Sequence, residues 1–261
     1  MLRNPNKVRE KLVNGEPVIG TVAYTWSPTV MEVAGIAGLD FVRIDCEHAW
    51  RQDEMADHLI RAAALSGVVP IMRIDRGSPY LAMKAFEIGA GGIIAVDIDT
   101  PEDAEAVVKQ SKFPPIGTRG YSGQCWSGGW GAKAGKEWIE WSDRELLVGV
   151  MIESPEAIKN VEEIMAIEGV DFALYGPADY SMSLGLRYPQ RNHPEIKDGL
   201  TKTIAAAQKF NKSVCYGVGT DLEQITKFKE MGLTMFELGS DIAVLRKTWN
   251  SLKKNIEKQS E

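Results

Sequence analysis

The sequence has little of several features that would indicate particular classes of protein. It contains only three cysteines, Cys46, Cys125 and Cys215, and this odd number at wide spacing matches neither a disulfide framework nor a zinc-ligand pattern. Positive charge is not in excess either, because 30 Lys and Arg stand against 36 Asp and Glu and give a formal net charge of −6. A nucleic-acid surface needs clustered positive charge, so we expect no nucleic-acid partner.

Long apolar runs are also missing. No stretch has the length of a signal peptide, and no window approaches the roughly 18 apolar residues of a membrane span. We therefore expect no membrane segment and a protein of the reducing cytoplasm. Hydrophobic residues nevertheless make up 44% of the chain, a proportion typical of folded globular proteins rather than disordered ones.

What the sequence does contain is an alternation of short apolar runs and helical segments. Helix start signals follow several of the runs, for example Thr100-Pro101 and Ser154-Pro155, where a hydroxyl caps the helix and proline lacks the amide that would be unsatisfied. Such alternation predicts parallel strands joined by right-handed crossovers. Eight runs are expected to be strands: Val18–Tyr24, Phe41–Asp45, Pro70–Ile74, Gly92–Val96, Leu147–Glu153, Asp171–Tyr175, Ser213–Val218 and Met235–Gly239.

Eight strand–helix units in a chain of 261 residues predict an α/β fold of the closed (β/α)8 type, the TIM barrel. The alternative is an open doubly wound sheet, which normally has a glycine-rich phosphate turn after its first strand, and none follows Tyr24. No linker divides the chain, so we expect residues 1–261 to form one domain that ends in a charged helix, Asp241–Lys258.

One connection, from Asp97 to Glu145, is longer than the others and contains a loop rich in glycine and tryptophan, Gly117–Gly131. Long loops inside a compact domain are often functional. We give equal weight to two interpretations, that this loop covers the active site and that it does not.

The charged residues of the predicted strands fall on one side of the strand alternation, which we take to be the barrel interior. Arg43 and Glu237 lie at mid-strand, where a charge is costly unless it is paired, and we predict a buried ion pair between them. The other charges lie at or just beyond the C-terminal ends of strands, where barrel enzymes place their chemistry: Asp45, Arg73, Asp97 and Glu153.

Two groups of residues have chemical potential of their own. His48 follows a strand end beside Asp45 and Glu47, which suits an imidazole acting as a base, although a surface histidine in a loop is the more common case. Glu153 and Asp179 follow neighbouring strands and together could hold a hard divalent cation, although each alone could be a helix cap.

Taken together, these segments resemble the HpcH/HpaI family of metal-dependent, class II pyruvate aldolases, which includes 4-hydroxy-2-oxoheptanedioate aldolase. The similarity runs in order from about residue 15 to residue 245. Its matching features are Gly38–His48, Arg73, Ile88–Gly92, Pro114–Gly120, Glu153 and Gly169–Asp179.

The resemblance implies a barrel whose last helix is exchanged between the subunits of a homodimer, which assembles further into a hexamer in many members. It implies cleavage, or formation, of a 4-hydroxy-2-oxo acid from pyruvate and an aldehyde through a metal-stabilised enolate, with Mg²⁺, Mn²⁺ or Co²⁺ as the cofactor. No Schiff-base lysine is needed, and Lys112, the lysine nearest to a strand end, lies in a loop.

The resemblance also implies a role for each matching residue. Glu153 and Asp179 would be the metal ligands, and Arg73 would contact the pyruvate unit. His48, supported by Asp45, would transfer a proton through a water molecule. The pyruvate carboxylate would be bound by backbone amides of the loop Gly176, Pro177, Ala178 and Asp179.

The sequence departs from the family pattern at several positions. Met151 replaces a frequent glutamine, Ile74 a common proline and Tyr180 a frequent leucine, while Arg43 and Glu237 stand where apolar residues are expected. Two alternatives therefore stay open. The chain could be an enolate-forming lyase of an acyl-CoA ester, as relatives of citrate lyase are, or a catalytically silent barrel that binds a small oxo acid.

Overall fold

Eight parallel strands close into a barrel in which each strand pairs with its neighbours in chain order. The computed structural model describes residues 5–49, 53–74, 80–219 and 222–258. The prediction of a (β/α)8 barrel is confirmed, and the first and last residues of each predicted strand differ by at most one position from those observed. The strands are β1 Val18–Ala23, β2 Phe41–Asp45, β3 Val69–Ile74, β4 Gly92–Ala95, β5 Leu147–Ile152, β6 Phe172–Tyr175, β7 Ser213–Gly217 and β8 Met235–Ser240.

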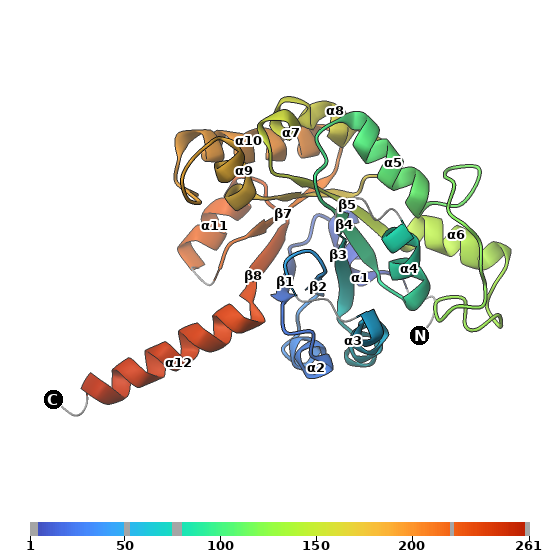
Figure 1. Ribbon diagram of the computed structural model, residues 1–261, viewed down its shortest axis with the longest axis horizontal. Helices are drawn as coiled ribbons and strands as arrows, with labels where there is room; N and C mark the ends of the chain where they lie inside the picture. The colour runs from blue at the N-terminus through green and yellow to red at the C-terminus, as the bar shows by residue number, and fades with distance from the viewer. Residues whose placement is uncertain (1–4, 50–52, 75–79, 220–221, 259–261) are drawn as a thin grey trace.

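Helices follow the strands and surround the barrel (Figure 1). Two predicted helix starts are confirmed, because the Thr100 side chain accepts a hydrogen bond from the Asp103 amide and the Ser154 side chain accepts one from the Ala157 amide. The helices are α1 Lys7–Val13, α2 Pro28–Ile36, α3 Asp53–Ser66, α4 Tyr80–Ile88, α5 Pro101–Ser111, α6 Lys136–Glu145, α7 Pro155–Lys159, α8 Val161–Ala166, α9 Pro177–Ser183, α10 Pro194–Lys209, α11 Leu222–Glu230 and α12 Asp241–Lys258.

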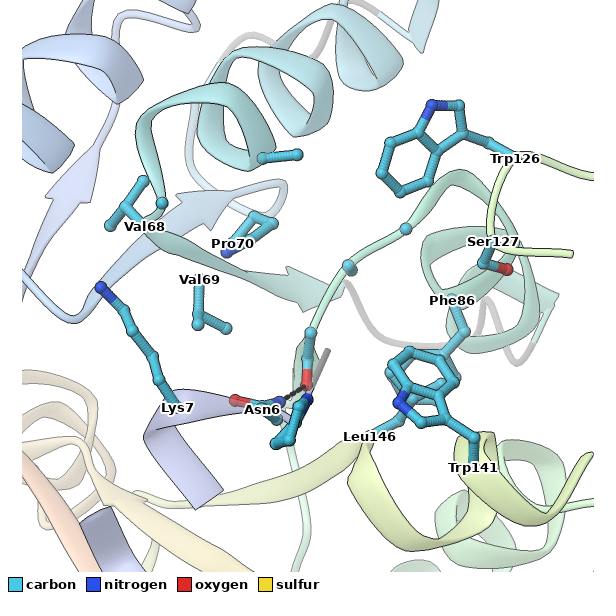
Figure 2. A pocket seen from close by; sticks show the side chains of 16 residues that line it. Asn6, Lys7, Val68, Val69, Pro70, Phe86, Trp126, Ser127, Trp141 and Leu146 are labelled. Atoms are coloured by element: carbon cyan, nitrogen blue, oxygen red, sulfur yellow. Dashed lines mark hydrogen bonds between the residues drawn. The ribbon is translucent and has the colours of Figure 1, made fainter. Parts of the chain in front are cut away.

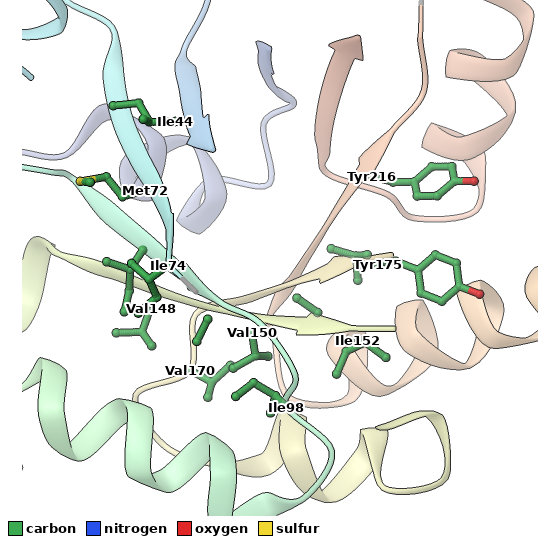
Figure 3. Packing of buried hydrophobic residues seen from close by; sticks show 14 of the residues in the cluster. Ile44, Met72, Ile74, Ile98, Val148, Val150, Ile152, Val170, Tyr175 and Tyr216 are labelled. Atoms are coloured by element: carbon green, nitrogen blue, oxygen red, sulfur yellow. The ribbon is translucent and has the colours of Figure 1, made fainter. Parts of the chain in front are cut away.

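Apolar side chains pack on both sides of the barrel wall. The larger cluster lies between strands and helices and includes Val148, Val150 and Ile152, all on the predicted outer side of β5 (Figure 3). A smaller cluster fills the interior and includes Phe41 and Phe172. Glycine is required beside these two rings, because a Cβ added at Gly20 or Gly149 would lie 2.4 Å from a ring carbon of Phe41 or Phe172.

The long connection lies away from the C-terminal end of its own barrel. The Ser127 amide donates to the Glu87 carbonyl, which anchors the loop beside the end of α4. Trp126 and Trp141 line a cavity of about 300 Å³ together with Val69 and other residues at the N-terminal ends of β3 and β4 (Figure 2). Of the two interpretations of this loop, the one in which it covers the active site of its own chain is therefore wrong.

The last helix, α12, extends away from the barrel (Figure 1). It has the predicted bounds and contains no buried residue. Apolar side chains recur along it at helical spacing and are exposed: Ile242, Leu245, Trp249, Leu252 and Ile256. In the part of the chain that the structure describes, no helix is both long and apolar enough to cross a membrane.

Candidate active site

Asp45 is the centre of a charged network at the C-terminal end of β2. Its carboxylate is fully buried and accepts hydrogen bonds from Arg43 Nη1 at 3.1 Å and from Arg73 Nη2. The backbone amides of Glu47 and His48 donate to its other oxygen at 3.1 and 2.8 Å. Burial raises the pKa of Asp45, but the charge of Arg73, the His48 amide and the charge of Arg43 outweigh burial and hold this pKa below its usual value.

The predicted ion pair between Arg43 and Glu237 is confirmed. Arg43 Nε donates to Glu237 Oε1 at 2.6 Å and Arg43 Nη2 donates to Glu237 Oε2 at 2.9 Å, a parallel two-bond geometry. The exposed fractions of the two residues are 7% and 3%. Because Arg43 also reaches Asp45, the pair is continuous with the network at the strand ends.

Arg73 extends this network from β3 toward a second carboxylate. Its Nη1 lies 3.0 Å from Glu47 Oε2 and 3.9 Å from the Met151 sulfur. Its Nε is buried and has no hydrogen-bond partner among the described residues. The guanidinium is therefore fixed by Asp45 and keeps one donor for another group.

His48 lies at the edge of the network, with 53% of its side chain exposed. Asp45 holds its backbone amide, while its ring Nε2 lies 3.8 Å from Glu47 Oε2. The structure therefore places the imidazole where solvent and a small molecule can reach it. The carboxylate that approaches the ring is that of Glu47, whereas Asp45 contacts the backbone of His48.

Glu153 and Asp179 follow the paired strands β5 and β6 at the same end of the barrel. Burial raises the pKa of Glu153 to about 8 against the lowering effect of the Asp97 amide, and the negative charges of Asp179, Glu47 and Asp97 add to the rise. The Asp97 amide lies 3.4 Å from Glu153 Oε1. The site therefore holds more negative charge than its own residues neutralise.

A glycine makes this close approach of two loops feasible. A Cβ added at Gly176 would lie 2.8 Å from Glu153 Cβ and 2.9 Å from Glu153 Oε2. The Gly176 amide donates to the Ile152 carbonyl at 3.0 Å, and Pro177 has no amide hydrogen. Of the predicted carboxylate-binding loop, the first-turn amides of Ala178 and Asp179 therefore remain as the donors that a helix does not use itself.

The carboxylates fit a divalent cation. Mg²⁺ and similar ions take oxygen ligands, often one or two carboxylates with water and substrate oxygens completing the shell. The described residues contain no group of three or more His, Cys, Asp or Glu side chains arranged to hold a metal. Glu153 and Asp179 would supply two ligands, and a bound cation would favour the ionised form of Glu153, whose pKa is raised by burial and further by the nearby carboxylates.

Two residues of the site were not singled out from the sequence. Glu47 is one, because its link to Arg73 depends on the fold of the loop after β2. Tyr24 is the other: burial and the charge of Asp45 raise the pKa of its hydroxyl, and Arg43, Arg73 and Glu237 also act on it. Its position directly after β1 is the signal that could have indicated it.

Lys112 takes no part in this site. Its ammonium donates to the carbonyls of Asp143 at 2.6 Å and Leu146 at 3.3 Å, just before β5 begins. It therefore lies at the opposite end of the barrel from Glu153, in agreement with a reaction that needs no Schiff base.

A closed parallel barrel with its acidic and basic groups at the C-terminal strand ends is the architecture of a (β/α)8-barrel enzyme. The model of the HpcH/HpaI aldolase/citrate lyase family matches residues 23–248. The chain therefore belongs to this family, and the predictions of the family and of a carbon–carbon lyase are confirmed at the family level.

Individual relatives are similar over almost their whole length. A 5-keto-4-deoxy-D-glucarate aldolase of Shigella boydii serotype 18 is 28% identical over 257 residues, which cover 97% of each chain. The solved HpcH/HpaI aldolase of Desulfitobacterium hafniense DCB-2 is 27% identical with a TM-score of 0.87 over 96% of each chain. The solved citrate synthase SbnG is 29% identical with a TM-score of 0.87 over 100% of each chain.

Proposed function

We propose that the protein is a metal-dependent aldolase that cleaves, or forms, a 4-hydroxy-2-oxo acid from pyruvate and an aldehyde. The observation that carries this proposal is that Glu153 and Asp179 follow the neighbouring strands β5 and β6, at the end of the barrel where Arg73 pairs with Asp45. The relatives named as aldolases support it.

The cofactor would be a divalent metal, with Mg²⁺, Mn²⁺ and Co²⁺ as candidates. Glu153 and Asp179 would hold it. When bound there, the cation would stabilise the negative charge that develops on the 2-oxo oxygen as the carbon–carbon bond breaks.

The protein's own groups have separate tasks in this proposal. Arg73 would bind the pyruvate unit with a guanidinium that Asp45 holds in place. The amides of Ala178 and Asp179 would bind its carboxylate. His48 would take the proton of the C4 hydroxyl through a water molecule, since its ring is exposed at the site edge.

We also propose a homodimer-based oligomer of a one-domain chain, residues 1–261, in which α12 packs on a partner subunit, with a hexamer as a possible higher assembly. The exposed apolar side chains along α12 support this proposal, because solvent-exposed stripes of this kind usually mark an interface. A Trp249→Glu variant should have a smaller mass in light scattering than the wild type. An unchanged mass would rule out this helix as the interface.

We place the protein in the cytoplasm, in keeping with three buried cysteines of which none is in a disulfide. Retention of a structural disulfide by protein purified from native cells would contradict this location.

The reaction is tested by a coupled assay of pyruvate release on a panel of 4-hydroxy-2-oxo acids, each measured with and without EDTA. Citrate is tested separately, by release of oxaloacetate, because one similar solved structure is a citrate synthase. We expect pyruvate from at least one 4-hydroxy-2-oxo acid and its loss on chelation. No turnover of any substrate would favour a silent oxo-acid-binding barrel, and turnover that survives chelation would exclude the metal.

A further inference from the structure

Strand β7 ends in a glycine, Gly217, at the mouth of the barrel. Gly217 pairs in register with Glu237, whose side chain lies in the interior, and Cys215 two residues earlier belongs to the interior cluster. Tyr216 belongs to the outer cluster and points toward the helices (Figure 3). By the alternation along β7, a side chain at position 217 would therefore point inward.

One existing side chain borders this inward position. For a Cβ added at Gly217, the single heavy atom within 4 Å among the described residues is Arg191 Nη2, at 3.8 Å. A larger residue at position 217 would fill the region that Arg191 faces. Glycine thus keeps room beside a guanidinium at the C-terminal end of the barrel.

Arg191 is held in place although it is exposed. Its Nη1 donates to the Gly217 carbonyl at 2.7 Å, and its guanidinium carbon lies 5.7 Å from the ring centroid of Tyr216. The residue comes from the segment between α9 and α10, and α9 carries Asp179 in its first turn. A hydrogen bond and a cation–π contact reduce the entropy that such a side chain would lose on binding a ligand.

The charges around the barrel end are divided by sign. Asp45, Glu47, Asp97, Glu153 and Asp179 follow β2, β4, β5 and β6, and Arg73 is already paired with two of these carboxylates. Arg191 makes no ion pair with any residue that the structure describes. Its hydrogen bonds to the Gly217 carbonyl and to the Tyr216 side chain use only part of the five N–H donors of a guanidinium. An anionic group of a substrate would therefore be repelled at β4–β6 unless a metal is bound, and attracted at β7.

We propose that Arg191 is a specificity-determining residue that binds an anionic group, a carboxylate, at the far end of the aldehyde half of the substrate. This inference rests on the proposed function, which puts the pyruvate half beside Arg73, Glu153 and Asp179. The other half then extends across the mouth into the space beside Gly217. Arg191 would accordingly be the residue of this chain that favours a diacid over a monoacid, because a second carboxylate matches the planar donors of the guanidinium.

The test compares a 4-hydroxy-2-oxo diacid with the monoacid of equal chain length, in which a methyl group replaces the far carboxylate. In Arg191→Gln, kcat/KM for the diacid should fall about 10- to 100-fold, mainly through KM, as expected for the loss of a charged hydrogen bond. The value for the monoacid should change less than about threefold, and Arg191→Lys should retain part of the preference. Arg144→Gln is the matched control, because this exposed arginine on α6 precedes β5 and lies at the other end of the barrel.

Equal losses for the two substrates in Arg191→Gln, or no loss for either, would overturn the inference. Absence of turnover by the wild type would overturn the proposed function, and a binding experiment then decides the role of Arg191 separately. With Mg²⁺ present, calorimetry should show that the wild type binds 2-oxoglutarate more tightly than 2-oxopentanoate and that Arg191→Gln removes the difference. Equal binding of the two acids by the wild type would contradict the assignment.

Discussion

The two ends of the barrel differ in the kinds of side chains that they bury. The C-terminal end carries a buried chain of alternating charges that runs from Glu237 through Arg43 and Asp45 to Arg73. The N-terminal end carries an apolar cavity bordered by Trp126 and Trp141 (Figure 2). Buried charge costs stability unless it is paired, so its concentration at one end indicates where the chemistry takes place.

Polar contacts at the N-terminal end have a different purpose. The Asn6 amide donates to Glu145 Oε2 at 2.9 Å, and the Asn6 side chain donates to the Gly91 carbonyl at 2.8 Å. These bonds fasten the segment before α1 to the segments before β4 and β5. They join backbone to side chain, so we expect these contacts to serve stability.

The largest expected effect comes from removing one buried carboxylate at each end. Asp45→Asn takes the counterion from Arg73 and Arg43, so kcat/KM for pyruvate release should fall by about 1000-fold and the free energy of unfolding by about 3–5 kcal/mol. Glu145→Gln should lower the free energy of unfolding by about 1 kcal/mol and leave kcat/KM unchanged. Steady-state kinetics give kcat/KM and urea unfolding gives the free energy of unfolding for each variant. An equal loss of activity in the two variants would show that the two ends do not differ in function.

The next effect concerns stability alone and distinguishes the Arg43–Glu237 ion pair from ordinary packing. Arg43→Met leaves Glu237 buried without its partner and should lower the free energy of unfolding by about 3–5 kcal/mol. The double variant Arg43→Met with Glu237→Leu should lose less than either single variant, because no uncompensated charge remains. Additive losses in urea unfolding would show that the two side chains do not act as a pair.

The smallest expected effect lies at the N-terminal end. Trp126 is partly buried beside Gly89, where an added Cβ would lie 2.4 Å from its ring. Trp126→Ala should lower the free energy of unfolding by about 1–3 kcal/mol through lost packing. The kcat/KM for pyruvate release should stay within about twofold of the wild type, and a loss beyond tenfold would mean that this end of the chain takes part in activity after all.

The strands and helices, and the inward or outward direction of side chains along each strand, depend on local pattern and could be predicted from the sequence. Alternation along single strands was enough to predict the inward charges and the pairing of Arg43 with Glu237, because strands two and eight both lie next to the first in a closed barrel. The place of the Gly117–Gly131 loop could not be predicted in the same way. It depends on contacts such as Ser127 to Glu87, which no local periodicity encodes.

The same limit applies to the site. Charged residues at or directly after strand ends were found, since the carboxyl ends of parallel strands meet at one end of the barrel, whereas the uncharged Tyr24 after β1 was missed. Glu47 and Arg191 were not singled out, because each reaches the barrel mouth through the path of a loop. Arg191 in particular is 26 residues from its partner Gly217.

The central proposal is that the charged end of the barrel is a metal-dependent lyase site in which Glu153 and Asp179 bind the metal. The most direct measurement is pyruvate release by protein freed of metal with EDTA and then titrated with Mn²⁺, in the wild type, in Glu153→Gln and in the exposed control Glu156→Gln. We predict that Mn²⁺ restores activity to the wild type and to Glu156→Gln, and that Glu153→Gln remains inactive and binds Mn²⁺ at least about tenfold more weakly. Normal Mn²⁺ binding and restored activity in Glu153→Gln would contradict the claim.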